Sequence, residues 1–531
     1  MAEPARRARL LAFAGVLAVL FLASLNFTVV GTALPRIVAE LEGVAFYAWA
    51  FTVFSLTSTV SLPLYGKLSD VYGRRVVMLF GIALFTASSL LIALSQDMLQ
   101  LVLFRGVQGL GAGALFSMSF AVIGELFTPR ERGKYQGLTS SVFGLSAVVG
   151  PIIGGLITDA FGWRWVFLVN LPVALVAFAL IYRNLPTGLR QPGAKVDYAG
   201  ALLLTAGVVP LLLALTWGGV DHPWGSPFIL GLLAASGLML WAFAWWQTRA
   251  PSPILEPGLF RDLTFNVANA SGFLAATGLF AAVIYLPLFV QGVQGGSAAS
   301  SGLVLTPLMG GLVLSSTLAG LLVSRTGRYK PFIVGGSALS VVALLLTATL
   351  DVGAPPLLVV LYMLLLGIGI GPTNSLFVLA VQNAMPAAQL GVVTGANQFF
   401  RQMGGTLGVA VFGAFLASSL RRGAQLYHPR EVTGLPAELA AEAFSPNLLT
   451  NPVALEGVQA QIAAHGATQV FAPFLSSMRA ALGAAIGEIF IVATALSLLA
   501  FLIALALPER VLRDTPRDTP QSGEPLPAAS D

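Results

Sequence analysis

The chain has 531 residues, of which 56% are hydrophobic and only 10% are charged. Because soluble proteins carry about 25% charged residues, this composition indicates a membrane protein. The net charge of +5 requires no nucleic-acid partner, since membrane proteins gather Lys and Arg on their cytoplasmic side. The absence of cysteine excludes thiolate metal sites and disulfides, and the histidines lie far apart in the sequence. We therefore expect no metal and no cofactor.

Apolar segments long enough to cross a membrane, which takes about 20 residues, follow one another along the chain. Six come first, at about 10–33, 47–65, 76–95, 98–123, 137–159 and 163–182. Two more lie at about 199–217 and 227–246. The last six lie at about 265–291, 300–323, 331–350, 355–380, 391–418 and 482–507. The sequence thus predicts an all-α polytopic membrane protein with 14 transmembrane helices in a 6 + 2 + 6 arrangement.

This arrangement divides the chain into four predicted parts. Residues 1–183 form an N-terminal six-helix bundle, and residues 184–263 form a two-helix central insertion with cytoplasmic linkers. Residues 264–508 form a C-terminal six-helix bundle that includes a long external loop at about 419–481. The Pro-, Asp- and Ser-rich residues 509–531 form a cytoplasmic tail that we expect to be disordered.

The basic residues predict the orientation in the membrane. When the N-terminus is placed in the cytoplasm, 20 of the 28 Lys and Arg residues fall on the cytoplasmic side. An even number of helices then returns the C-terminus to the cytoplasm. We expect a multi-pass protein of the bacterial inner membrane.

A short charged turn, Gly66–Arg75, recurs half a chain later as Gly320–Lys330. At an offset of 254 residues, Gly73 aligns with Gly327 and Arg74 with Arg328. A basic turn that recurs between apolar segments indicates two halves built on one plan. The two copies differ at one acid, because Asp70 aligns with Ser324.

Several motifs together resemble the major facilitator superfamily. Gly66–Arg75 is similar to that superfamily's signature loop between helices 2 and 3. Further matches to its helix motifs, and to its fourteen-span drug:proton antiporter branch of multidrug efflux permeases, are Leu25–Pro35, Arg105–Gly113, Gly150–Gly155, Trp163–Phe167 and Arg401–Gly405. The resemblance covers both halves of the chain and implies the major facilitator fold.

The resemblance implies that the first turn is a conformational latch at the cytoplasmic end. Asp70 would pair with Arg74 and with Glu125 at the end of helix 4, and these contacts would break when the transporter turns inward. The latch residues are Gly66, Asp70, Gly73, Arg74, Arg75 and Glu125. Charged loops beside membranes often act only as topological anchors, and this is the alternative interpretation.

Charges within the apolar segments indicate candidates for coupling. Arg105, with Gln108 one turn away, resembles the family's proposed proton-transfer arginine; the alternative is a structural arginine that satisfies carbonyl groups. The branch usually has an acid where this chain has Asn26, and no carboxylate lies well inside a predicted span. Glu488 is the deepest acid and therefore the remaining coupling candidate.

Two further sets of residues complete the predicted site. Proline and small residues in helix 5 predict a bend with close packing, at Gly150, Pro151, Gly154 and Gly155. A substrate cavity is expected near the midplane between the halves. Its candidate residues are Asn26, Thr28, Asn269, Phe273, Asn374, Asn397, Gln398 and Arg401.

We therefore predict a monomeric secondary transporter in the lipid bilayer, working by alternating access. By resemblance it exports hydrophobic drugs or related small molecules, coupled to the entry of protons. Asn26 and the missing acid favour an alternative: an exporter of lipids, metabolites or anions with the same fold and different coupling. An enzyme would need a set of catalytic groups inside the spans, and none is evident. The paired signature turns argue against a passive channel.

Overall fold

The computed structural model describes all but a few short stretches and two longer ones near the C-terminus. The described residues are 3–42, 46–187, 195–219, 222–296, 298–426, 456–460, 471–510 and 512. Within these ranges the secondary structure is helical and contains no β-strand.

The predicted N-terminal bundle consists of long helices joined by short turns. In chain order they are α1 (Glu3–Leu41), α2 (Tyr47–Tyr72), α3 (Arg74–Ala93), α4 (Met98–Leu126), α5 (Pro129–Phe161), α6 (Arg164–Leu168) and α7 (Asn170–Asn184). The short α6 and α7 together occupy the sixth predicted span. The central insertion is the pair α8 (Tyr198–Trp217) and α9 (Pro227–Gln247).

The C-terminal bundle follows a short 3-10 turn, η2 (Pro257–Arg261). Its helical segments are α10 (Leu263–Leu288) with its π-helical continuation η3 (Phe289–Val293), α11 (Ala298–Thr326), α12 (Lys330–Thr347), α13 (Pro356–Ala384), η4 (Ala387–Gln389), α14 (Leu390–Leu426) and α18 (Phe471–Leu505).

The predicted all-α architecture is confirmed. In the described part of the chain, 13 helical segments are long and apolar enough to cross a membrane. The 26-residue α2 occupies the remaining predicted position, and its Ser and Thr residues between 52 and 61 lower its hydropathy. Large apolar side chains on the outer faces, such as Leu156, Leu175 and Trp241, are about two-thirds exposed, as expected for contact with lipid.

The helices that flank the predicted external loop are longer than their apolar segments. α14 continues to Leu426 and α18 begins at Phe471, because charged residues such as Arg422 and Arg479 interrupt an apolar segment without ending a helix. Residues 456–460 are the only other described part of the predicted loop at 419–481. Of the predicted tail at 509–531, only residues 509, 510 and 512 are described. The rest of both segments lies outside the described residues.

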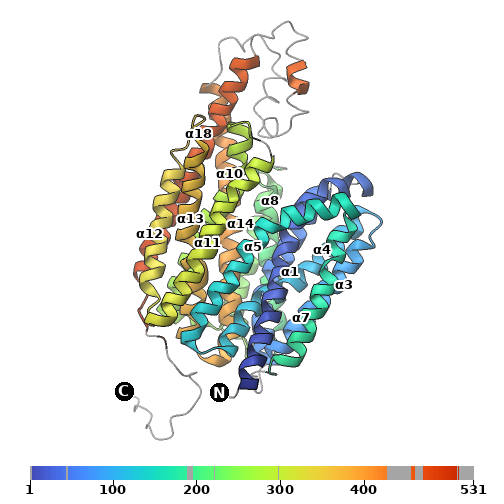
Figure 1. Ribbon diagram of the computed structural model, residues 1–531, viewed down its shortest axis with the longest axis vertical. Coiled ribbons are helices and arrows are strands. Elements are labelled where there is room, and N and C mark those ends of the chain that lie inside the picture. The colour runs from blue at the N-terminus through green and yellow to red at the C-terminus, as the bar shows by residue number, and fades with distance from the viewer. Residues whose placement is uncertain are drawn as a thin grey trace.

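The two bundles lie side by side and come together at the end where α1 begins and α18 ends (Figure 1). The most extensive contacts between them are made by two helix pairs: α2 with α14, and α11 with α5. The 254-residue offset maps α2 onto α11, so the two pairs are copies of one arrangement. By the distribution of basic residues, this joined end is the predicted cytoplasmic end.

The first glycine of each signature turn permits this close approach. A Cβ atom added at Gly66 would lie 2.6 Å from the carbonyl oxygen of Gly391, and one at Gly320 would lie 2.1 Å from that of Gly133. Any side chain at these positions would therefore push the halves apart. The later glycines end the helices: Gly73 and Gly327 have φ values of 93° and 71°, which side chains rarely adopt.

The inserted pair packs against one of these joints. α8 contacts α2 and α14, and its Leu204, Val208 and Leu212 belong to a cluster that includes Leu62 of α2. Asp197 ties the pair together, because its carboxylate accepts hydrogen bonds from Trp246 Nε1 and Gln247 Nε2 at 2.9 and 3.0 Å.

The predicted hinge in α5 lies against α1. A Cβ atom at Gly150 would lie 2.0 Å from Thr28 Oγ1, and one at Gly154 would lie 2.4 Å from Thr32 Oγ1. Gly155, by contrast, has no atom within 4 Å of this position. α5 continues without interruption through Pro151. Gly150 and Gly154 therefore provide a contact surface for α1.

We predict that Gly154→Ala destabilises the protein whereas Gly155→Ala does not. Overpacking of the α1–α5 contact should lower the free energy of unfolding by about 1–3 kcal/mol. The neighbouring substitution should be neutral or gain up to about 1 kcal/mol from helix propensity. Thermal unfolding of the purified variants in detergent measures the difference. Equal melting temperatures for the two variants would contradict this packing.

Candidate functional site

A central cavity lies between the two halves. The lining residues come from α1, α2, α4 and α5 of the first half and from α10, α13 and α14 of the second. The empty volume is about 1130 Å³, which includes the open space next to the cavity. Gly391 of α14 is at the joined end, and Arg401, ten residues later, is in the cavity wall. Ten residues of α-helix span about 15 Å along the helix axis. This depth places the cavity near the middle of a hydrocarbon layer about 30 Å thick.

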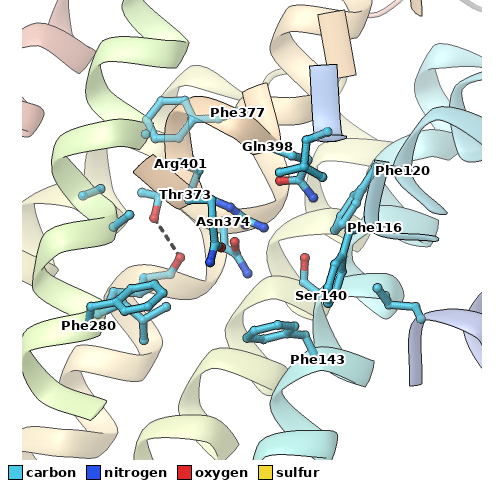
Figure 2. A pocket seen from close by; sticks show the side chains of 18 of the residues that line it. Phe116, Phe120, Ser140, Phe143, Phe280, Thr373, Asn374, Phe377, Gln398 and Arg401 are labelled. Atoms are coloured by element: carbon cyan, nitrogen blue, oxygen red, sulfur yellow. Dashed lines mark hydrogen bonds between the residues drawn. The ribbon is translucent and has the colours of Figure 1, made fainter. Parts of the chain in front are cut away.

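The cavity wall is mostly apolar and carries a single charge. Phenylalanine side chains from both halves face the space, with a smaller group of polar side chains (Figure 2). The polar lining residues are Ser58, Ser140, Thr373, Asn374, Gln398, Arg401 and Gln402. None of the lining residues is acidic. Walls of this kind suit hydrophobic solutes.

The structure brings three of the predicted cavity residues into this wall: Asn374, Gln398 and Arg401. Two others, Asn269 and Asn397, are buried and bind each other, because Asn397 Nδ2 donates to Asn269 Oδ1 at 3.0 Å. Phe273 packs beside Gly404 of α14, outside the lining. The remaining two, Asn26 and Thr28, also lie outside it.

Thr28 contacts α5 instead. Its hydroxyl lies 3.2 Å from the carbonyl oxygen of Ser146 and 3.0 Å from that of Leu25. The side chain thus belongs to the α1–α5 contact described above.

Arg105 is completely buried and is held by neutral partners. Its Nη1 donates to Asn26 Oδ1 at 2.6 Å and to Gln108 Oε1 at 2.8 Å, and its Nε donates to the carbonyl oxygen of Ala50 at 3.1 Å. The guanidinium also lies 4.2 Å from the ring centre of Phe54. Gln108 donates in turn to Ser89 Oγ at 2.7 Å. Asn26 therefore supplies an oxygen to Arg105 at the position where the resemblance described above implies an acid.

Glu488 lies apart from both features. It forms an ion pair with Arg422 at 2.8 Å, accepts a hydrogen bond from Ser419, and its side chain is 44% exposed. It is at the middle of α18, and its partners Ser419 and Arg422 lie near the C-terminal end of α14. The candidate coupling residues Arg105 and Glu488 thus occupy separate environments.

The residues of the first signature turn join the halves. The buried carboxylate of Asp70 accepts hydrogen bonds from the backbone N–H groups of Gly391 and Val392, at 3.0 and 2.9 Å. These groups are at the start of α14, where unpaired N–H groups and the helix dipole favour an anion. Asp70 of α2 therefore caps a helix of the opposite half.

Arg74 completes this contact. It forms an ion pair with Glu125 at 2.8 Å, lies 3.6 Å from Asp70, and donates to the carbonyl oxygen of Ala387 at 3.1 Å. The last of these bonds also crosses between the halves. Arg75 faces elsewhere: it donates to the carbonyl oxygen of Tyr182 and lies over the Tyr182 ring.

The second signature turn uses a different acid. Arg328, the counterpart of Arg74, forms a two-point ion pair with Glu509 at 2.6 and 2.8 Å. Glu509 follows α18, and it is accompanied by Arg510, which pairs with Asp262 at 2.8 Å. The charged side chain of the second turn therefore pairs within its own half. The turn is still joined to the opposite half, because Arg130 of α5 donates to the carbonyl oxygens of Ser324 and Arg325 at 3.0 and 3.2 Å.

Several contacts between the halves were not among the predicted site residues. Gln136 donates to Gln382 at 2.8 Å, and Gln382 donates to the carbonyl oxygen of Phe120 at 3.0 Å. The hydroxyl oxygens of Ser141 and Thr317 are 2.8 Å apart. Glutamines within apolar segments were a usable signal for the first group. Serine and threonine are common in membrane helices and gave no comparable signal.

This fold and this cavity are those of a membrane transporter, and the comparisons with known proteins agree. Residues 16–409 match the family model of the Major Facilitator Superfamily. The chain belongs to this superfamily of membrane transport proteins.

Its relatives include named drug transporters. The chain is 40% identical to the multidrug transporter protein MdtP of Bacillus subtilis, over 77% of this chain and 75% of MdtP. It is 34% identical to multidrug resistance protein 3 of the same organism, over 75% of this chain and 78% of that protein. The human organic anion transporter MFSD10 has a similar fold, with a TM-score of 0.60 at 17% identity over 95% of this chain and 100% of that one.

We predict that Asn26→Leu destabilises the protein and that Asn26→Asp does not. Leucine removes the oxygen that Arg105 binds, and an unpaired buried polar group costs about 1–3 kcal/mol. Aspartate keeps the oxygen and adds an opposite charge. Thermal unfolding in detergent should therefore rank the leucine variant well below the wild type and the aspartate variant at or above it. A leucine variant that melts like the wild type would show that Arg105 does not depend on Asn26.

Proposed function

We propose that the protein exports hydrophobic small molecules by alternating access, driven by the entry of protons. The observation that carries this proposal is a central cavity, lined by both halves, beside a joint that holds the halves together at one end. With the predicted orientation, the joint closes the cytoplasmic end, so the structure corresponds to an outward-facing state. The named drug transporters among the relatives support hydrophobic cargo.

Asp70 is our candidate for the step that links protons to the conformational change. Among the described acids it is the most buried, at 2% exposed, and it contacts both halves. A proton on Asp70 would remove the charge that attracts Arg74 and the start of α14. The cytoplasmic joint would then weaken and the inward-facing state would become accessible.

A second candidate keeps the mechanism and changes the cargo to lipids, metabolites or anions. The specific observation in its favour is that the lining residues include Arg401 and no acid. We propose neither an enzymatic activity nor a nucleic-acid partner, and we place the protein in the bacterial inner membrane as a monomer.

Transport into proteoliposomes tests the proposal. We expect an imposed pH gradient to drive accumulation of a neutral hydrophobic dye, and an ionophore that dissipates the gradient to abolish it. Asp70→Asn should reduce the gradient-driven rate at least tenfold, because the variant lacks the titrating carboxyl. Asp97→Asn is the matched control, since Asp97 only caps α4 and asparagine also caps helices well. Accumulation that persists without a gradient would refute proton coupling.

A further inference from the structure

Arg401 differs from the other arginine within the membrane. Arg105 is enclosed by Asn26, Gln108, Ala50 and Phe54 and has no contact with the cavity. Arg401 lines the cavity and is only partly buried, and it forms no hydrogen bond or ion pair within the described part of the chain. A guanidinium near the membrane midplane is costly unless water or a ligand pairs with it. Arg401 is thus a charged group that is free to bind a solute.

The neighbours of Arg401 form a polar region on one side of the cavity. Gln398 and Gln402 are three residues before and one residue after Arg401 on α14, and Asn374 approaches from α13 (Figure 2). Their amide groups can donate hydrogen bonds. Together with the guanidinium, they offer a group of donors with no acid beside it among the lining residues.

Phenylalanine side chains flank this polar region. Phe116, Phe120 and Phe143 come from the first half, and Phe280 and Phe377 come from the second (Figure 2). A ligand that fills the cavity therefore meets donors from α13 and α14 together with phenylalanine rings from both halves. A planar carboxylate matches the paired N–H groups of a guanidinium, and an apolar body matches the rings.

We propose that the cavity selects hydrophobic monocarboxylates and that Arg401 binds their carboxylate. This inference rests on the proposed export function and specifies its cargo. A neutral hydrophobic molecule can occupy the same walls but leaves Arg401 without a partner. A hydrophobic cation is disfavoured, because it brings a like charge into a cavity with no acid in its lining.

Binding of three probes with one aromatic body tests this selectivity: pyrenebutyrate, its neutral amide and the corresponding pyrenebutylamine. Purified full-length protein in phosphatidylcholine nanodiscs, with protein-free nanodiscs as the blank, gives the dissociation constants at neutral pH. We expect the carboxylate to bind about tenfold to a hundredfold more tightly than the amide, as for a hydrogen bond to a charged group. The amine should bind most weakly.

Substitutions then assign the preference to one residue. Arg401→Gln should reduce the carboxylate preference over the amide to less than threefold, mainly by weakening carboxylate binding. Arg401→Lys keeps the charge but loses the paired donors. It should retain the order of affinities, carboxylate above amide above amine, with a smaller difference between carboxylate and amide. This variant tests the assignment if the glutamine variant does not fold. Arg422→Gln, at a mostly exposed arginine paired with Glu488, should behave as the wild type.

Two outcomes overturn the inference: tight binding of the amine, or a carboxylate preference that Arg401→Gln leaves intact. Either can occur while the neutral dye is still accumulated in proteoliposomes, in which case only the cargo assignment fails. If neither the neutral dye nor pyrenebutyrate is transported, the proposed export function fails, whatever the binding preference.

Discussion

The structure depends on one carboxylate at the joined end of the molecule. Asp70 belongs to α2 of the first half, yet its oxygens accept hydrogen bonds from the N–H groups of Gly391 and Val392, at the start of α14 in the second half. The start of a helix attracts an anion, and burial strengthens this attraction because water does not screen it. The contact is possible only because Gly66 and Gly391 let the two helix backbones approach closely. Gly66 and Asp70 of the signature turn thus both hold α2 and α14, which belong to different halves, together.

The internal repeat explains why this contact is asymmetric. Gly320 meets Gly133 as Gly66 meets Gly391, so the backbone approach is present twice. The acid is present only once, because Ser324 stands where the repeat would place a second aspartate. Arg328 instead pairs with Glu509 from the C-terminal segment. The joined end therefore has two close helix pairs: a buried carboxylate reinforces one, and Arg130, which donates to backbone carbonyl oxygens of α11, reinforces the other.

The two arginines within the membrane segments, Arg105 and Arg401, also have different roles. Arg105 is surrounded by neutral oxygens and rings and belongs to the packing of the first half. Arg401 faces the cavity between the halves. Asn26 is neutral and lies outside the cavity lining, so Arg401 sets the electrostatic character of the cavity.

Much of the fold could be predicted from the sequence, and less of the site. Length and hydropathy indicate fourteen helices, because each helix that crosses the bilayer needs about 20 mostly apolar residues. The repeated turn indicates two halves. The contact between Asn26 and Arg105 could not be inferred, because it joins residues 79 positions apart on different helices. The lining phenylalanines could not be distinguished from the many that face lipid. Glu509 belongs to a segment whose composition predicted disorder, so its pairing with Arg328 gave no sequence signal.

The rate of cross-linking between the halves tests the central claim most directly. The chain has no native cysteine, so Ser141→Cys with Thr317→Cys places one thiol pair across the α5–α11 joint, where the native hydroxyl oxygens are 2.8 Å apart. If Asp70 holds the halves together, a short thiol cross-linker should react several times more slowly when Asp70→Asn is added, and Asp97→Asn should leave the rate unchanged. Equal cross-linking rates in all three proteins would show that the joint does not depend on Asp70.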